Sequence, residues 1–220
     1  MDGIQRSVLR VGCAALLGGC AVNVAQPPAT WDGLDYRPGQ ESGALYVRPG
    51  AQSMAYRTVM VDPLAVAIPE HWYPVGGTSE HLGTGPRKLS SSELQHIKDT
   101  LAGRFRYLFV AELTDGGYRV VERPGDDTVR VSPGLADVYM NTPERSLTAR
   151  RRADSMTLVM DVRDATTGEL LARLVDRQKG VMGALQFPNT VANSVDFRRA
   201  VEAWAQRLRA GLDEMSKQSP

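Results

Sequence analysis

The residues with the clearest chemical potential are two histidines and a glutamate that share one segment. His71 and His81 lie in Pro69–Leu89, a stretch rich in proline and glycine, and Glu80 adjoins His81. Two imidazoles and a carboxylate can bind Zn²⁺ and activate water for hydrolysis. Their spacing fits no established zinc site, so the sequence predicts no metal and no other cofactor. A metal-dependent hydrolase that uses His71 and His81 stays open as an alternative.

Four carboxylates surround a predicted β-hairpin: Asp161, Asp164, Glu169 and Asp176. A pair of them could serve acid–base chemistry if the two side chains met. The hairpin register places Asp164 opposite Glu169 and brings Asp176 near Thr157, so Asp161 and Asp176 do not meet. We therefore predict exposed charges, which also protect the edge of a sheet from unwanted pairing.

Other chemistry is excluded by composition and by missing motifs. Lys and Arg total 26 against 25 Asp and Glu, which excludes a strongly basic nucleic-acid binder. The phosphate-loop, dinucleotide, HExxH and GxSxG motifs are all missing. We therefore predict a protein that is not an enzyme and has no nucleic-acid partner.

The one basic run, Arg150-Arg151-Arg152, is a candidate contact for a membrane. Anionic lipid head groups attract such clusters by about 1 kcal/mol per residue near the surface. The alternative is a solvated loop ahead of the next strand.

The N-terminal segment has the features of a targeting signal. A weakly basic start precedes the apolar run Val11–Leu17, which is far too short to span a membrane. This pattern is typical of a secretory signal peptide. The residues Leu17–Cys20 resemble a bacterial lipobox, which implies cleavage before Cys20 and attachment of acyl chains such as palmitate to that residue. Ala21 resembles the residue after the cysteine in lipoproteins sent to the outer membrane.

The domain organisation follows from these signals. We predict a signal peptide over residues 1–19, a lipidated tether over 20–44 and a single periplasmic domain over 45–216. The tether is rich in Pro, Gly, Gln and Asp, and order within it is expected only near Trp31–Tyr36, where an aromatic pair could dock.

The domain must position its residues on a small number of elements. Arg57–Ile68 has a strand pattern interrupted at Asp62-Pro63, where proline predicts a bulge or edge position. Ser90 and Glu93 form a capping box that opens a helix running to about Leu113. Three further segments have strand patterns, the second of them broken at Pro133-Gly134: Tyr118–Glu122, Thr128–Met140 and Met156–Arg163.

The hairpin and the last helix complete the pattern. A turn ending at Gly168 leads to a strand over Leu170–Asp176, and Gly168 is expected at positive φ. A helix over Asn193–Met215 presents one apolar stripe: Phe197, Val201, Trp204, Leu208 and Leu212. Its polar face is expected to carry Arg198, Arg199, Glu202 and Arg209. The order β-α-β-β-β-β-α predicts an α+β two-layer sandwich with a mixed, mostly antiparallel sheet and both helices on one face.

Short motifs in this order resemble those of a known family. They are Leu45–Gly50, Tyr56–Pro63, Gly117–Val121, Asp137-Val138, Arg163-Asp164, Thr167–Ala172, Trp204-Ala205 and Leu208-Arg209. The chain from Leu45 to Leu212 is similar to the proteobacterial lipoproteins grouped as domain of unknown function 3313. The resemblance implies a location and a size, and it supplies no activity or catalytic residue.

The sequence therefore predicts a lipoprotein of the outer membrane that faces the periplasm. It would act as a non-catalytic binding or structural module, held to the membrane through Cys20, with another envelope protein or further copies of the chain as partners. Four residues of one loop are the expected contact surface: His71, Trp72, Tyr73 and His81. Aromatic residues on a long loop supply the contact area that binding hot spots need. A lipoprotein with a pocket for a small or lipidic molecule is the alternative, and a large apolar cavity would favour it.

Overall fold

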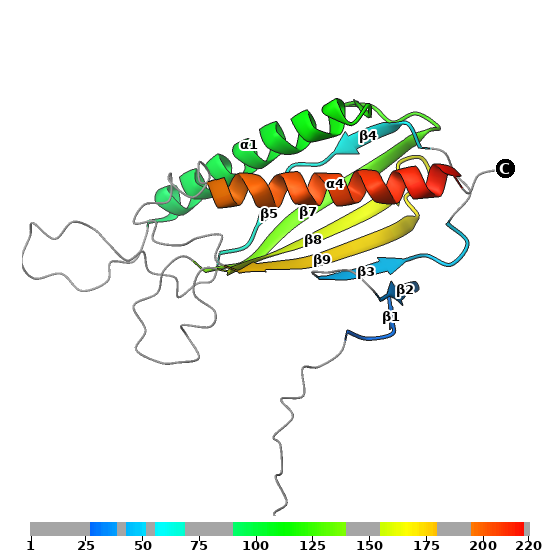
Figure 1. The fold of residues 1–220 in the computed structure, drawn as a ribbon. Coiled ribbons are helices and arrows are strands. Elements are labelled where there is room, and N and C mark those ends of the chain that lie inside the picture. Colours follow the sequence, from blue (N-terminus) through cyan, green and yellow to red (C-terminus); the bar gives the residue numbers. More distant parts are fainter. Residues whose placement is uncertain are drawn as a thin grey trace, which may run out of the picture.

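The computed structural model describes residues 27–38, 43–51, 56–68, 90–139, 155–179 and 195–217. Within these ranges the chain forms a nine-stranded sheet and two long helices (Figure 1). The elements are β1 (Thr30–Trp31), β2 (Leu34–Arg37), β3 (Ala44–Val47), β4 (Thr58–Val61), β5 (Ala65–Val66), α1 (Ser91–Asp115), β6 (Arg119–Val120), β7 (Thr128–Tyr139), β8 (Ser155–Asp164), β9 (Leu170–Lys179) and α4 (Val195–Lys217).

The sheet is mixed and mostly antiparallel. Its strand order is β1-β2-β3-β9-β8-β7-β4-β6, and β5 pairs with β7 beside this path. The parallel pairs are β4 with β6, β4 with β7 and β5 with β7. Both helices lie on one face of the sheet (Figure 1). The predicted α+β class is confirmed, and so is the predicted element order from β4 to α4 when β4 and β5 are taken as one interrupted strand.

The interruption between β4 and β5 explains why β7 can continue through a proline. We expected a break at Pro133-Gly134, and this expectation is wrong, because both residues lie within β7 and pair with β8. The carbonyls of Val131 and Leu135 accept hydrogen bonds from Asp62 and Ala67. Alternation places the nitrogen of Pro133 on the same side, opposite the gap between the two short strands. A residue without an N–H is tolerated there because no ladder bond is needed.

Helix α1 begins at the predicted capping box and buries the predicted apolar face. The Ser90 hydroxyl accepts from the N–H of Glu93 at 3.3 Å, and the Glu93 carboxylate accepts from the N–H of Ser90 at 2.8 Å. This reciprocal pair is the predicted capping box. The helix ends at Asp115, and Gly117 follows at φ +86°. Its buried residues pack into the core: Ile97, Leu101, Phe105, Leu108, Phe109 and Leu113.

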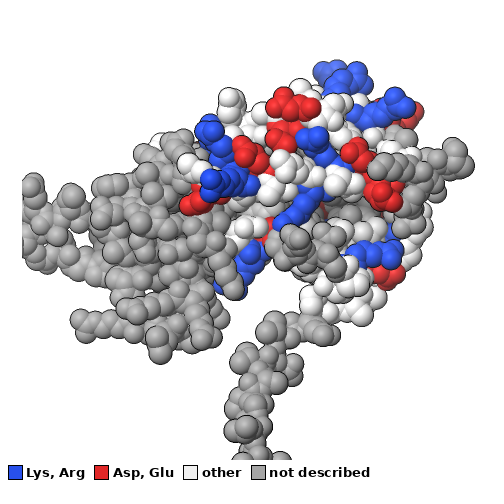
Figure 2. Space-filling model, viewed as in Figure 1, with Lys and Arg blue, Asp and Glu red and all other residues white. Residues whose placement is uncertain are grey.

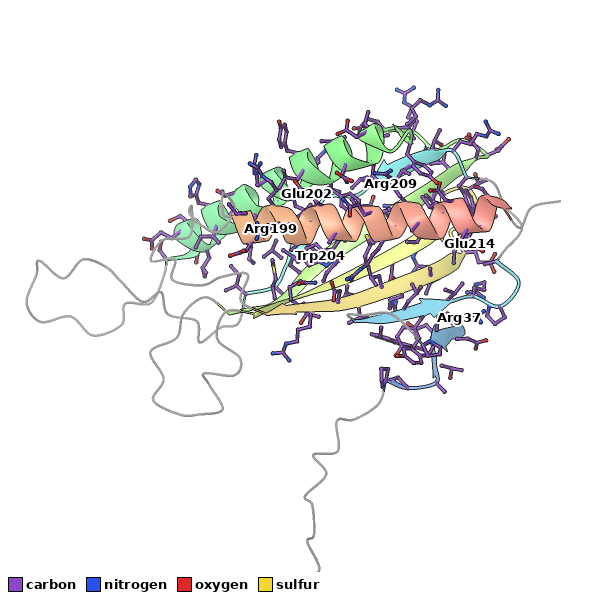
Figure 3. The ribbon with its side chains drawn as sticks, viewed as in Figure 1. Arg37, Arg199, Glu202, Trp204, Arg209 and Glu214 are labelled. Atoms are coloured by element: carbon purple, nitrogen blue, oxygen red, sulfur yellow. The ribbon has the colours of Figure 1, made fainter. Side chains whose placement is uncertain are left out.

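Helix α4 buries the whole of its predicted stripe. The five residues are no more than 6% exposed, and Trp204 is fully buried. Figure 3 shows Trp204 on the side of α4 that faces the sheet, while Arg199 lies towards the other end of the helix from Glu214. We expected Arg209 on the solvated polar face of the helix, but its side chain lies between α4 and α1. Its guanidinium Nη1 donates to the carbonyl of Glu112 at 3.3 Å, and its side chain lies against Gly116 between the two helices.

Two strands precede the segment where we expected the domain to begin. β1 and β2 form a hairpin inside the stretch assigned to the tether, and β3 joins it to β9. The expected aromatic docking is present, with the Tyr46 ring centroid 5.5 Å from that of Trp31 and 5.6 Å from that of Tyr36. Gly43 lies at φ +82°, and a Cβ there would collide with the carbonyl of Val175. Glycine is therefore required for β3 to lie beside β9.

An arginine on the sheet face opposite the helices holds this hairpin in place. The Arg173 guanidinium donates to both oxygens of Asp161, at 2.6 and 2.9 Å, and to Asp32 at 2.6 Å. The Trp31 ring centroid lies 4.5 Å from its Cζ. Bonding to Asp161, more than to Asp32, raises the pKa of Arg173. The arrangement fixes β1 and β2 against β8 and β9.

The β8–β9 hairpin turns at the expected residues. Gly168 lies at φ +75°, and its N–H donates to the carbonyl of Asp164 at 2.9 Å. One oxygen of Asp164 accepts from the N–H groups of Thr166 and Thr167 at 2.9 and 2.6 Å. The other accepts from the hydroxyl of Tyr56 at 2.9 Å. Asp164 is only 4% exposed, so our expectation of an exposed charge is wrong here.

We expect Asp164→Ala to lower the free energy of unfolding by about 2 kcal/mol at neutral pH, because buried donors lose their acceptor. The N–H of Thr167 is the main cause that holds the pKa of Asp164 below its ordinary value. Its stabilising effect is therefore complete above the unfolded pKa, about 3.9, and is lost as the pH falls towards the lower folded value. Urea unfolding at several pH values should show a difference between wild type and variant that shrinks below about pH 4.

The matched control for this prediction is Asp126→Ala, which removes an exposed carboxylate. It should change stability by less than about 0.5 kcal/mol at any pH. A difference between wild type and Asp164→Ala that stayed constant down to pH 2 would contradict the role given to the charge.

Candidate ligand pocket

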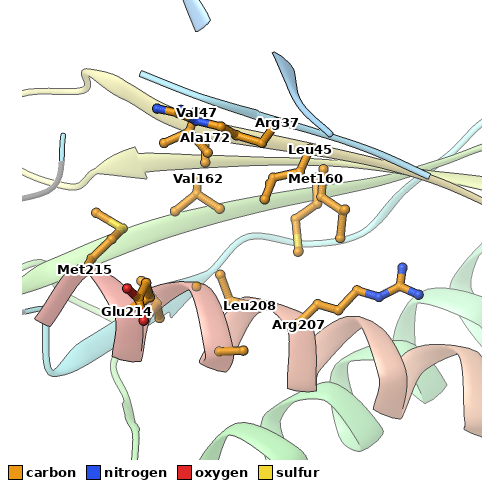
Figure 4. A pocket seen from close by; sticks show the side chains of 14 residues that line it. Arg37, Leu45, Val47, Met160, Val162, Ala172, Arg207, Leu208, Glu214 and Met215 are labelled. Atoms are coloured by element: carbon orange, nitrogen blue, oxygen red, sulfur yellow. The ribbon is translucent and has the colours of Figure 1, made fainter. Parts of the chain in front are cut away.

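An apolar cavity of about 450 Å³ lies between the C-terminal half of α4 and the sheet (Figure 4). Its sheet wall comes from three adjacent strands: Leu45 and Val47 of β3, Ala172 and Leu174 of β9, and Met160 and Val162 of β8. Its helix wall includes Leu208, Leu212 and Met215. The volume falls within the range of about 300–1,000 Å³ that is common for small-molecule sites.

The alternation of the strands explains why this wall is apolar. In β3, Ala44 and Tyr46 pack with Leu34 in a small cluster separate from the main core. Successive side chains of a strand point to opposite faces, so Leu45 and Val47 point towards α4. The same rule places Ala172 and Leu174 of β9 on the helix side, where they line the cavity.

Small residues leave the space open. Ala172 is the smallest side chain of the sheet wall, and Ala210 and Gly211 line the helix wall. A Cβ added to Gly211 would meet nothing within 4 Å. The small side chain of Ala172 therefore leaves space between β9 and α4.

Three charged side chains also line the cavity: Arg37, Arg207 and Glu214. Arg207 donates through Nη1 to Asp176 at 2.8 Å. Glu214 has an interaction of its own. Arg37 is exposed at the end of β2, and Figure 4 shows it beside Val47 and Ala172. Among the described residues, Arg37 has no hydrogen bond or ion pair.

Asp176 anchors the sheet beneath α4 next to Arg207. It is fully buried, and one of its oxygens accepts from Trp204 Nε1 at 2.7 Å, from Arg207 and from Gln178 Nε2 at 2.6 Å. Its other oxygen has no hydrogen-bond partner among the described residues. The prediction of an exposed charge at Asp176 is wrong. The predicted register is nearly right, since Asp176 pairs with Leu158, the neighbour of Thr157.

The other two hairpin carboxylates are Asp161 and Glu169. The Asp161 side chain is 18% exposed and binds Arg173, and that of Glu169 is 52% exposed and lies 3.2 Å from Arg48. Asp161 and Asp176 do not meet, as the predicted register implied, because Asp161 lies on the face opposite the helices and Asp176 beneath α4.

The residues singled out for function in the sequence lie outside the described residues. They are Cys20, His71, Trp72, Tyr73, His81, Arg150, Arg151 and Arg152. Within the described ranges no group of three or more His, Cys, Asp or Glu side chains is placed to hold a metal ion. His96 is exposed on α1, as its position off the apolar stripe predicts. No helix in the described part is long and apolar enough to cross a membrane.

Acidic and basic side chains are interspersed on the surface shown in Figure 2. The described part of this face carries no large patch of one sign. Strong electrostatic attraction of a polyanion, which needs a concentrated basic surface, has no basis there.

The fold and the cavity define the chain as an α+β domain with an apolar pocket between its helix layer and its sheet. The chain belongs to the family described as "Protein of unknown function (DUF3313)", which it matches over residues 30–208. The family resemblance predicted from the short motifs is thereby confirmed. The match begins at β1, so it includes the N-terminal hairpin.

Comparison with solved structures gives a weak likeness. The PelC dodecamer from Paraburkholderia phytofirmans and a point variant of it are 10% and 9% identical to this chain, each with a TM-score of 0.35. The match covers 73% of this chain and 96% and 98% of those chains. At this TM-score the likeness defines neither the function nor the assembly of the chain. No curated protein matches the sequence.

Proposed function

We propose that this protein is a non-catalytic binding module of the cell envelope and that the cavity under α4 is its ligand site. The observation that carries the proposal is the apolar cavity itself, with its walls from β3, β8, β9 and α4. Apolar pockets with a small number of polar groups at their edge are the usual form of a small-molecule site. The chain would bind a molecule with a large apolar part there and would not change it chemically.

The location is a second part of the proposal. The run Val11–Leu17 followed by Leu17–Cys20 supports cleavage before Cys20 and acylation of that residue. Two or more acyl chains hold a protein stably on a membrane, whereas one gives only marginal binding. The domain would then face the periplasm from the outer membrane, with partners among other envelope proteins or further copies of itself.

The expected mass of the mature protein tests the anchor. Intact-mass measurement of the envelope fraction should give a chain that begins at Cys20 and carries additional acyl mass. Cys20→Ser should abolish both the cleavage and the acyl mass. A full-length, unmodified chain recovered from the membrane would contradict the anchor without touching the pocket.

Filling the cavity should abolish ligand binding. In the full chain carrying Cys20→Ser, Ala172→Phe places a ring in the space between β9 and α4. We expect the neutral apolar dye Nile red to bind the Cys20→Ser parent. It should bind the Ala172→Phe variant at least about tenfold more weakly, because the phenylalanine ring fills the site. Fluorescence titration measures both affinities.

The matched control is Val159→Phe, the addition of a ring on the neighbouring strand. Val159 points to the opposite face, where its partner in β7 is Gly134, which has no side chain. This variant should bind Nile red like the unsubstituted pocket. Thermal midpoints of both variants should stay near that of the parent. Equal binding by Ala172→Phe and the parent, with both folded, would show that the cavity is not the site.

A further inference from the structure

The charged residues of the cavity wall indicate the charge of the ligand. Of the three that line it, Arg207 is bonded to Asp176, and Glu214 has an interaction of its own. Arg37 is therefore the one charged lining residue without a partner among the described residues. An apolar cavity with a single unpaired cation at its edge is complementary to an amphipathic anion.

The position of Arg37 supports this assignment. Arg37 pairs with Leu45 in the β2–β3 ladder, two residues along from the pair of Asp35 with Val47. Leu34 and Tyr36 pack in the small cluster on the face opposite the helices. Alternation therefore directs Arg37 to the same side as Leu45, which lines the cavity. Arg37 lines the cavity and is exposed, so a head group bound to it would remain in contact with water.

The sheet wall and the helix wall together supply the surface for an aliphatic chain. Met160 of β8 and Leu208 and Met215 of α4 present flexible or branched aliphatic side chains, and none of the described lining residues is aromatic. Methionine side chains adapt to irregular apolar shapes, which suits a flexible chain better than a rigid ring system. The affinity of an aliphatic ligand should therefore depend on the length of its chain.

We infer that the ligand is a single-chain fatty acyl anion, with its aliphatic chain in the cavity and its carboxylate against Arg37. This inference rests on the proposed function, because it needs the cavity to be a ligand site. It goes further in assigning a charge to the ligand and a residue to its recognition. The recognition is of a long-chain carboxylate, not of a membrane surface.

Three probes with the same dodecyl chain separate the two claims. They are dodecanoate, dodecan-1-ol and dodecyltrimethylammonium, each used below its aggregation limit to displace Nile red from the full chain carrying Cys20→Ser. That substitution removes any covalently attached acyl chain that would compete. We expect dodecanoate to bind about fivefold more tightly than the alcohol, and the cation to bind most weakly. The preference for the anion should fall as salt is added, because Arg37 is exposed.

Substitution of Arg37 should remove the preference and keep the binding. In Arg37→Gln the carboxylate and the alcohol should bind equally, at the affinity that the alcohol has for the parent. The matched control is Arg199→Gln, which removes an arginine that is 75% exposed at the other end of α4 (Figure 3). It should retain the preference. Shortening the carboxylate from twelve to ten carbons should weaken binding about fourfold per methylene.

The outcomes distinguish the inference from the proposal beneath it. If dodecanoate and dodecan-1-ol bind the parent equally, or if Arg37→Gln keeps the preference, the assignment of an anionic ligand is overturned and the pocket stands. If none of the three probes displaces the dye and Ala172→Phe has no effect, the pocket itself is not a ligand site. Binding that is independent of chain length would overturn the placement of the chain in the cavity.

Discussion

Trp204→Ala should lower the free energy of unfolding by about 4 kcal/mol, the largest effect expected for a single substitution in this domain. Trp204 is fully buried in the core between α4 and the sheet, with its ring centroid 6.4 Å from that of Phe105. Truncation removes a large apolar surface and leaves a cavity that the two layers cannot close. It also removes the N–H donor to Asp176. Urea unfolding followed by circular dichroism measures the loss.

Two other variants divide this effect into its causes. Trp204→Phe keeps most of the apolar volume and loses the donor, so we expect a loss of about 2 kcal/mol. Trp31→Ala removes a tryptophan that is 38% exposed on the other face, and we expect a loss of about 1 kcal/mol from its contact with Arg173. If Trp204→Ala cost no more than Trp31→Ala, the placement of Trp204 in the core would be wrong.

Arg207→Met should have the second-largest effect, a loss of about 3 kcal/mol. Asp176 has no exposed surface, and Arg207 is the cation that binds it, at 2.8 Å. A buried carboxylate that loses its cation keeps its full cost of desolvation and loses the attraction that offset it. Because Arg207 also lines the cavity, this variant tests the support of the site as well as the stability of the domain.

A double variant gives the sharper test of this pair. Asp176→Asn removes the charge and keeps an acceptor for Trp204, so the combination with Arg207→Met should be more stable than Arg207→Met alone. The control Arg199→Met removes an exposed arginine and should change stability by less than about 0.5 kcal/mol. Losses that simply add in the double variant would show that the two groups are not coupled.

Much of this fold can be predicted from the sequence, because its longest elements have strong local patterns. The apolar stripes of α1 and α4 and the capping box at Ser90 are contained within single segments. The β8–β9 hairpin is likewise defined by its alternation and by Gly168. Signals of this kind lie within one segment and can be recognised without knowledge of the tertiary contacts.

The parts that escaped prediction depend on residues far apart in the sequence. β3 is a strand because Ala44 pairs with Val175, and its four residues carry too short a pattern to show this alone. Asp164 is buried by Tyr56, and Asp176 is buried beneath Trp204. A charged residue beside a turn is normally exposed, and only the tertiary partners reverse that expectation.

The cavity under α4 has no signal in the sequence for a physical reason. It depends on the small side chain of Ala172, and a small residue leaves a cavity only where the facing layer does not fill the space. Arg37 belongs to the predicted tether, and its place in the cavity lining is visible only when β2 is seen beside β3. The family match includes this hairpin but assigns it no role.

The most direct test of the account uses the methionine methyl groups of the full chain carrying Cys20→Ser. Met160 and Met215 line the cavity, whereas Met156 is buried outside its lining and Met60 lies on β4. With ¹³C-methyl-labelled methionine, titration with dodecanoate should shift the NMR signals of Met160 and Met215 and leave those of Met60 and Met156 in place. Unchanged Met160 and Met215 signals at saturating dodecanoate, or equal shifts at all four positions, would contradict a ligand site under α4.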